Sequence, residues 1–234
     1  MNNKIKLLCF PYAGGSGLVY NKWKQYLNKN IDLIPIEMSG RGRRFNEPLL
    51  ECMEDVVNDL YMEVSEQLGN EEYALYGHSM GTVVIYELMD KIYKNANKKP
   101  LHIFLSGRYP PHLAESSVIH SLPPEQFEQE IIRLGGTTPE VFHNTELRNI
   151  FIPILKSDYM VVENYTFIDR NYRWDCDITI LNGTEDKGLT GKEISEWNRY
   201  TNGKCNFYCF SGGHFFINQH MQEVVDIINQ NMSY

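Results

Sequence analysis

The sequence has little positive charge, no long hydrophobic run and no paired cysteine motif. Its 234 residues include 22 basic and 30 acidic side chains, for a net charge of −8. Without a broad basic field to attract phosphates, a general nucleic-acid partner is not expected. The first ten residues hold only a four-residue apolar stretch after Lys4 and Lys6, too short for a signal-peptide core or a membrane span. We therefore expect a cytoplasmic protein that does not bind membranes.

The cysteines are not expected to form disulfides or a metal site. The five cysteines are odd in number, lack a C-x-x-C pair and mostly lie in apolar, strand-like surroundings. We interpret them as reduced packing residues and expect no structural zinc site. The length suits one α/β domain that buries a sizeable core without disulfides or metals. The five are Cys9, Cys52, Cys176, Cys205 and Cys209.

Short apolar runs alternate with helical patterns along the chain. Most runs are continuous, which is typical of strands buried on both faces. They cover residues 4–9, 31–36, 73–78, 101–106, 177–182 and 205–210. Apolar residues at helical spacing occur over 49–68, 82–93, 193–200 and 219–231. This alternation predicts an α/β fold, with a mostly parallel sheet, helices on both faces and functional loops at the carboxyl ends of the strands.

Residues 109–170 interrupt the alternation. They contain no clear strand, and helical fragments over 125–134 and 145–162 follow proline breaks. We expect a single domain, 1–234, with a helical insertion at about 109–170. Long insertions in compact domains are usually functional, so this one is predicted to be a lid; a helical subdomain that covers apolar surface is the alternative.

A Gly-x-Ser-x-Gly motif, Gly77 to Gly81, follows the third apolar run and precedes a helical pattern. This is the context of a nucleophile elbow, in which a strained turn exposes the serine at a helix N-terminus. We therefore predict that Ser79 is a nucleophile. The backbone N–H of Met80 and the helix dipole would stabilise an oxyanion on the attacked carbonyl. A glycine-rich turn without chemistry is the alternative.

A serine hydroxyl needs a general base, and that base needs an orienting acid. His214 follows the last apolar run through the flexible Gly212-Gly213, and Asp186 follows the fifth run. The order Ser, Asp, His is that of an α/β-hydrolase and differs from the orders of chymotrypsin and subtilisin.

Other residues could take the roles of acid and base. Alternative acids are Glu185, Asp158, Asp169, Asp175 and Asp177. The other histidines suit the base less well: His78 lies in the elbow, His102 in a strand, His112, His120 and His143 in the insertion, and His220 at the final helix.

The glycine-rich loop of residues 10–17 follows the first apolar run. Its glycines would let backbone N–H groups approach a ligand, so we expect a second oxyanion donor there. A phosphate-binding role is weakly supported, because the loop lacks both G-K-[ST] and a full G-x-G-x-x-G pattern.

Several segments together resemble the type II thioesterases, the stand-alone α/β-hydrolases that serve nonribosomal peptide and polyketide synthases. These enzymes are similar to medium-chain fatty acyl carrier thioesterases. The segments occur in order and span nearly the whole chain: FPYAGG (10–15), Trp23, GRGRR (40–44), GHSMG (77–81), LGGT (134–137), KSDY (156–159) and GGHFF (212–216). The family often has histidine where this chain has Tyr12, a position outside the triad.

The resemblance implies a serine thioesterase that hydrolyses acyl thioesters on the phosphopantetheine arm of an acyl or peptidyl carrier protein. It assigns Ser79, Asp186 and His214 to the triad and the Ala13 and Met80 N–H groups to the oxyanion hole, with no cofactor or metal. The insertion would cover the site, and a monomer is expected. Three alternatives stay open: a small-molecule carboxylesterase, a medium-chain fatty acyl carrier thioesterase, or a non-catalytic binding protein on the same fold.

Three arginines, Arg41, Arg43 and Arg44, form a local basic cluster after the second apolar run. Such a cluster would attract an acidic carrier protein despite the negative net charge. The alternative is a set of structural ion pairs.

Overall fold

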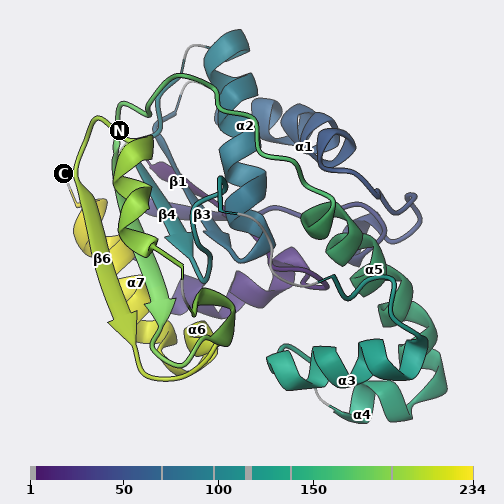
Figure 1. The fold of residues 1–234 in the computed structure, drawn as a ribbon. Coiled ribbons are helices and arrows are strands. Elements are labelled where there is room, and N and C mark those ends of the chain that lie inside the picture. Colours follow the sequence, from purple (N-terminus) through teal and green to yellow (C-terminus); the bar gives the residue numbers. More distant parts are fainter. Residues whose placement is uncertain are drawn as a thin grey trace.

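The computed structural model describes residues 4–69, 71–96, 98–113, 118–137, 139–190 and 192–233. Their centre is a six-stranded sheet in the order β2-β1-β3-β4-β5-β6, in which every neighbouring pair is parallel (Figure 1). All six predicted strands are present. They are β1 (Ile5–Phe10), β2 (Ile31–Pro35), β3 (Tyr73–His78), β4 (His102–Ser106), β5 (Asp177–Gly183) and β6 (Cys205–Phe210).

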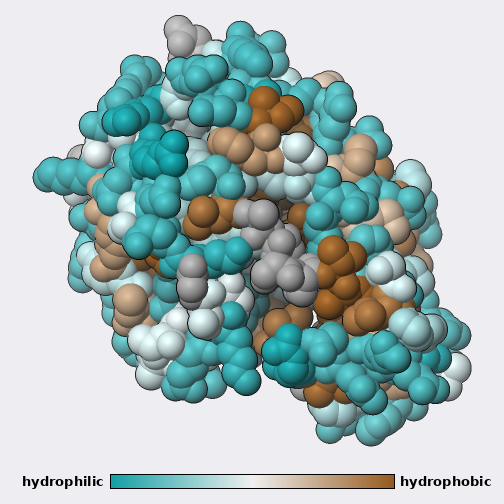
Figure 2. Space-filling model, viewed as in Figure 1, coloured by the Kyte–Doolittle hydropathy of each residue, from teal (hydrophilic) through white to brown (hydrophobic). Residues whose placement is uncertain are grey.

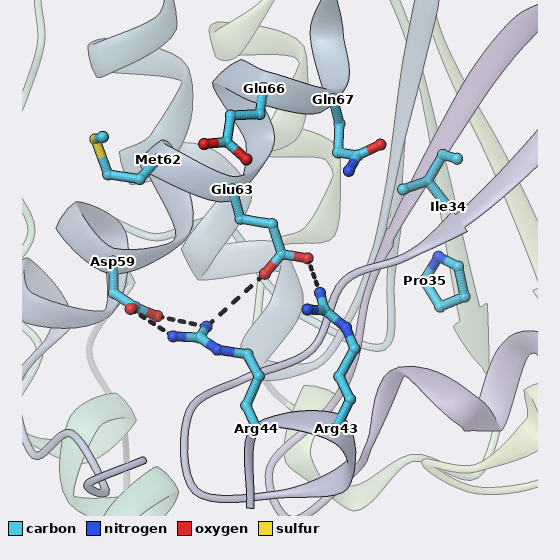
Figure 3. A pocket seen from close by; sticks show the side chains of 9 residues that line it. All are labelled: Ile34, Pro35, Arg43, Arg44, Asp59, Met62, Glu63, Glu66 and Gln67. Carbon is cyan, nitrogen blue, oxygen red and sulfur yellow. Dashed lines mark hydrogen bonds and ion pairs between the residues drawn. The ribbon is translucent and has the colours of Figure 1, made fainter. Parts of the chain in front are cut away.

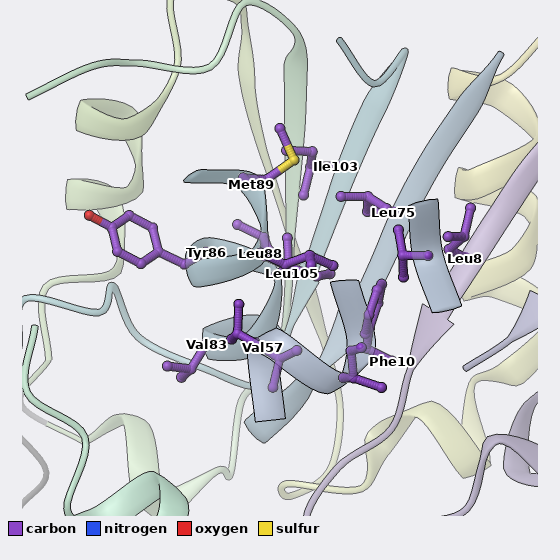
Figure 4. Close-up of a cluster of buried hydrophobic side chains, with 14 of the residues drawn as sticks. Leu8, Phe10, Val57, Leu75, Val83, Tyr86, Leu88, Met89, Ile103 and Leu105 are labelled. Carbon is purple, nitrogen blue, oxygen red and sulfur yellow. The ribbon is translucent and has the colours of Figure 1, made fainter. Parts of the chain in front are cut away.

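Two apolar layers cover the sheet, because alternate side chains of each strand point to opposite faces. On one face Leu8, Phe10 and Leu75 pack against α1 (Met53–Leu68) and α2 (Met80–Ala96) (Figure 4). On the other, Leu7, Cys9 and Tyr76 pack against η1 (Gly17–Gln25) and α7 (Met221–Asn231). The central strands are therefore buried on both faces, as their continuous apolar sequences predicted.

Two segments differ from the sequence pattern. β6 is an edge strand, so Phe207 and Tyr208 stay exposed although the run is apolar. The segment predicted to be helical over 193–200 forms a 3₁₀ helix, η4 (Ile194–Tyr200), which buries Trp197 and Tyr200. The short helices η2 (Gly42–Arg44), η3 (Lys187–Leu189) and α6 (Phe216–Gln219) complete the connections.

The helical insertion lies between β4 and β5. It contains α3 (Pro124–Leu134), α4 (Pro139–His143) and α5 (Thr145–Glu163), with a small apolar core that includes Phe127, Ile131 and Leu155. In Figure 1, α3 and α4 project away from the sheet, whereas α5 runs back toward it. Residues 114–117 and 138 of the predicted 109–170 insertion lie outside the described residues. Within the described chain, no helix is long and apolar enough to cross a bilayer.

Candidate active site

Ser79 occupies a strained turn between β3 and α2. Its φ of 55° is left-handed, which is costly for a residue with a side chain. The turn is held by the Ser79 N–H, which donates to the Ser106 carbonyl on β4 at 2.8 Å. Neither flanking glycine has room for a side chain: a Cβ on Gly77 would overlap the Gly81 backbone, and one on Gly81 would overlap the Phe10 carbonyl. The geometry is that of the predicted elbow.

Asp186 and His214 meet across the ends of β5 and β6. The Nδ1 atom of His214 lies 2.7 Å from Oδ2 of Asp186, and the second carboxylate oxygen accepts the Gly188 N–H at 3.0 Å. Asp186 is 7% exposed. The two loops are close because Gly183 at the end of β5 lies against the backbone of Gly212 and Gly213. An Nδ1–H bonded to the carboxylate leaves Nε2 as the basic nitrogen of His214.

Ser79 and His214 line one cavity of about 330 Å³, together with Asp186 and Met80. No hydrogen bond joins Ser79 to His214 in the described structure. Such bonds are often long before substrate binds. The insertion supplies one wall of the cavity through Ile119, Glu130, Arg133, Leu134, Tyr159, Val162 and Glu163. Hydrophobic side chains gather where this insertion meets the body of the molecule (Figure 2).

The alternative acids have other partners. The Asp158 carboxylate pairs with Arg41, and that of Asp175 pairs with Lys99. The Asp169 and Asp177 carboxylates accept the backbone N–H groups of Asn171 and Lys204. Glu185 is exposed. Asp186 is therefore the one candidate acid that contacts His214 among the described residues.

His78, the histidine of the elbow, is the last residue of β3 and packs behind His214. It is fully buried, its ring centroid lies 5.2 Å from that of His214, and its Nδ1 lies 2.8 Å from the Ser106 hydroxyl. Burial, together with the neighbouring His214, lowers the pKa of His78, so the ring is neutral and fills space beneath the base. The histidines bonded elsewhere are His102, His112, His120 and His220.

The glycine-rich loop presents a backbone donor to the cavity. The N–H groups of Gly14, Gly15 and Gly17 donate to Asp158, Tyr12 and Glu37, respectively. In contrast, the Ala13 N–H has no acceptor among the described residues, and neither has the Met80 N–H at the start of α2. Ala13 and Met80 both line the cavity. Two unpaired donors beside a serine are what an oxyanion hole requires.

The thioesterase domain model matches residues 5–232. Gramicidin S biosynthesis protein GrsT of Aneurinibacillus migulanus is 31% identical, over 96% of this chain and 88% of GrsT. The chain belongs to the thioesterase family. The medium-chain S-acyl fatty acid synthase thioesterase of Anas platyrhynchos is 33% identical, over 92% of this chain and 86% of its own.

Similar solved structures narrow the kind of thioesterase. ClbQ from the colibactin NRPS/PKS pathway is 37% identical and matches with a TM-score of 0.93, over 98% of this chain and 97% of ClbQ. The type II thioesterase BorB from the borrelidin cluster is 28% identical, with a TM-score of 0.88 over 98% and 93% of the two chains. The predicted α/β-hydrolase fold and the resemblance to type II thioesterases are confirmed, and the protein is a thioester hydrolase.

The arginine cluster divides into two sites. Arg41 is 5% exposed and its guanidinium bonds both oxygens of Asp158, with 2.6 Å from Nη2 to Oδ1. The guanidinium of Arg41 is therefore used inside the protein, which supports the alternative of a structural ion pair over the expected carrier contact at this residue. Arg43 and Arg44 instead line an open hollow of about 510 Å³, where they pair with Glu63 and Asp59 (Figure 3).

Sequence reasoning did not foresee the two carboxylates that hold the glycine-rich loop. Asp158 accepts the Gly14 N–H at 2.7 Å, and Glu37 accepts the Ser16 hydroxyl at 2.7 Å. Both carboxylates are buried. Asp158 lies in the KSDY segment that carried part of the family resemblance, which was the available signal.

Proposed function

We propose that this thioesterase removes acyl groups from the phosphopantetheine arm of carrier proteins in nonribosomal peptide or polyketide synthesis. The observation that supports this most directly is the set of groups at one cavity: Ser79, a histidine bonded to Asp186, and two unpaired N–H donors. Family membership supports thioester chemistry at that set, and the names of GrsT and ClbQ support a carrier-linked pathway.

In the proposed reaction, Ser79 Oγ attacks the thioester carbonyl as His214 Nε2 takes its proton. The Ala13 and Met80 N–H groups stabilise the tetrahedral oxyanion, and on its collapse His214 gives its proton to the departing sulfur, which leaves as the phosphopantetheine thiol. The neutral His214 then takes a proton from water, which attacks the acyl-serine, and returns that proton to Ser79 Oγ as the carboxylic acid is released. Asp186 keeps the imidazole tautomer and stabilises its charged form.

The insertion is proposed to be a lid. Its side chains form a wall of the cavity, and a Cβ on Gly136, at the end of α3, would overlap the ring of Phe215 beside His214. An acyl group on the arm would enter between this wall and the body of the enzyme. Removing aberrant short acyl groups would release stalled carriers.

A mass-spectrometric assay tests the proposal. Acetyl-phosphopantetheinyl carrier protein is incubated with wild type or with Ser79→Ala, alongside the same acyl group on free pantetheine. We expect loss of acetyl only with wild type, and faster from the carrier. If wild type cleaves small esters but leaves the carrier acylated, a carboxylesterase replaces the carrier assignment. Faster release of medium-chain than of acetyl groups would favour a fatty acyl carrier thioesterase.

We also propose a cytoplasmic monomer. Ser79, Asp186 and His214 all come from one chain and line one cavity, so the site needs no second copy. Light scattering after size-exclusion chromatography measures the mass, and a dimer with full activity only above its dissociation constant would contradict the proposal.

A further inference from the structure

Asp158 on α5 lies beneath the glycine-rich loop, far from its partners in sequence. It is 2% exposed, its Oδ2 accepts the Gly14 N–H at 2.7 Å, and both oxygens bond Arg41. Arg41 also donates from Nη1 to the Gly15 carbonyl at 3.4 Å. One buried ion pair thus bonds two backbone groups of the loop, the N–H of Gly14 and the carbonyl of Gly15.

The loop rests directly on this helix. Gly14 has a φ of 77°, and a Cβ there would overlap the side chain of Leu155. Leu155 and Asp158 are three residues apart on α5, so they share one face of the helix. The contact with Leu155 and the hydrogen bond to Asp158 therefore both hold Gly14 against the same face of α5.

This arrangement leaves one loop N–H for the reaction. The Gly14, Gly15 and Gly17 N–H groups are each bonded within the protein, whereas Ala13 lines the cavity and its N–H has no acceptor in the described chain. Releasing Gly14 would free its N–H and loosen the direction of the Ala13 peptide. An oxyanion donor loses most of its value when it is misplaced by about 1 Å.

We propose that Arg41 and Asp158 are positioning residues that aim the Ala13 N–H at the oxyanion. The inference rests on the proposed oxyanion hole. Because Asp158 belongs to α5, the insertion that forms a wall of the cavity also holds the catalytic loop in place. The pair would therefore contribute to transition-state binding and not merely to stability.

Replacing the whole pair separates these two roles. A buried ion pair can often be exchanged for apolar side chains without loss of stability, whereas removing one partner strands a charge. We would therefore make Arg41→Met/Asp158→Leu and measure melting temperature, KM and kcat on acetyl-N-acetylcysteamine, and the affinity for an alkyl boronic acid. The boronate mimics the tetrahedral state and so reports the oxyanion hole.

The expected result is a kcat about 10- to 100-fold lower, with a matching loss of boronate affinity, a KM within about threefold and a nearly unchanged melting temperature. A folded double variant with wild-type kcat and boronate affinity would overturn the inference. Should that variant not fold, Gly14→Ala provides the test, because it lifts the loop from Leu155 with the pair intact. It should show the same joint loss, and wild-type values would count against the proposal.

A matched control is Arg170→Met/Glu87→Leu. This ion pair is also largely buried and also leaves one donor, the Tyr165 hydroxyl, without its acceptor, but it does not touch the loop. Asp90, which Arg170 also contacts, keeps its ion pair with Lys94. Its kcat should equal that of wild type. Ser79→Ala in the same assay keeps the two proposals apart. If Ser79→Ala retains activity, the proposed site fails; if only Ser79→Ala is inactive, the positioning role alone fails.

Discussion

Two ion-pair sites begin in the same short segment, residues 41–44, and behave differently. The Arg41–Asp158 pair is buried and joins α5 to the glycine-rich loop. The Arg43 and Arg44 pairs line an open hollow with Asp59, Glu63 and Glu66, so their positive charge is compensated at the surface (Figure 3). The burial of the whole pair distinguishes the sites: the Arg41 and Asp158 side chains are 6% and 3% exposed, whereas Arg44, at 11%, pairs with the more exposed Asp59 and Glu47.

The largest expected effect comes from removing one partner at each site. Asp158→Ala leaves Arg41 buried without its counter-charge and should lower the free energy of unfolding by about 3–5 kcal/mol. Asp59→Ala leaves the partly exposed Arg44 with Glu47, Glu63 and the Glu37 carbonyl, and should cost about 1 kcal/mol or less. Urea unfolding of both variants measures the difference. Equal losses would show that burial does not distinguish the two sites.

The pH dependence of stability at a buried histidine also tests whether burial determines how strongly a charged group affects stability. His102 bonds the Thr179 hydroxyl inside the sheet, and burial lowers its pKa from 6.5 to about 4. The folded state then binds fewer protons than the unfolded state, so stability is fully present above pH 6.5 and falls as the pH drops toward 4. Between pH 6.5 and about 5 the loss should be about 2 kcal/mol. The stability gap between wild type and His102→Gln should shrink by this amount; a constant gap would contradict the assignment.

The smallest effect is expected at Arg43 and Arg44, the two arginines that line the open hollow. Arg43→Ala with Arg44→Ala should slow turnover of a carrier-linked acyl group about two- to fivefold, because surface charges contribute at most about 1 kcal/mol, and should spare a small ester. The loss should diminish at high salt. Equal losses on both substrates would mean that these residues serve only as structural ion pairs.

The strands and the order of the site residues could be predicted because their signals are local. Continuous apolar runs gave all six strands, and Gly77, Ser79 and Gly81 marked the elbow. Asp186 and His214 followed strand ends, so parallel pairing brings their loops to one edge of the sheet.

Contacts between distant segments could not be predicted in this way. Arg41 and Asp158 are 117 positions apart, and no periodicity in either segment indicates the other. On sequence alone Asp158 was an alternative acid for the triad, because its pairing with Arg41 depends on the packing of α5 against the glycine-rich loop. The apolar spacing over 193–200 likewise indicated a helix but did not distinguish the 3₁₀ geometry of η4 from an α-helix.

The proposed acyl-serine intermediate can be tested by following the acyl group onto the enzyme. Wild type is mixed with acetyl-carrier protein, quenched within one turnover and digested, and the peptide that contains Ser79 is examined by mass spectrometry. We expect one acetyl group on Ser79 of wild type, and neither adduct nor deacylated carrier with Ser79→Ala. An acetyl group on another residue, or carrier deacylation by Ser79→Ala, would contradict this expectation.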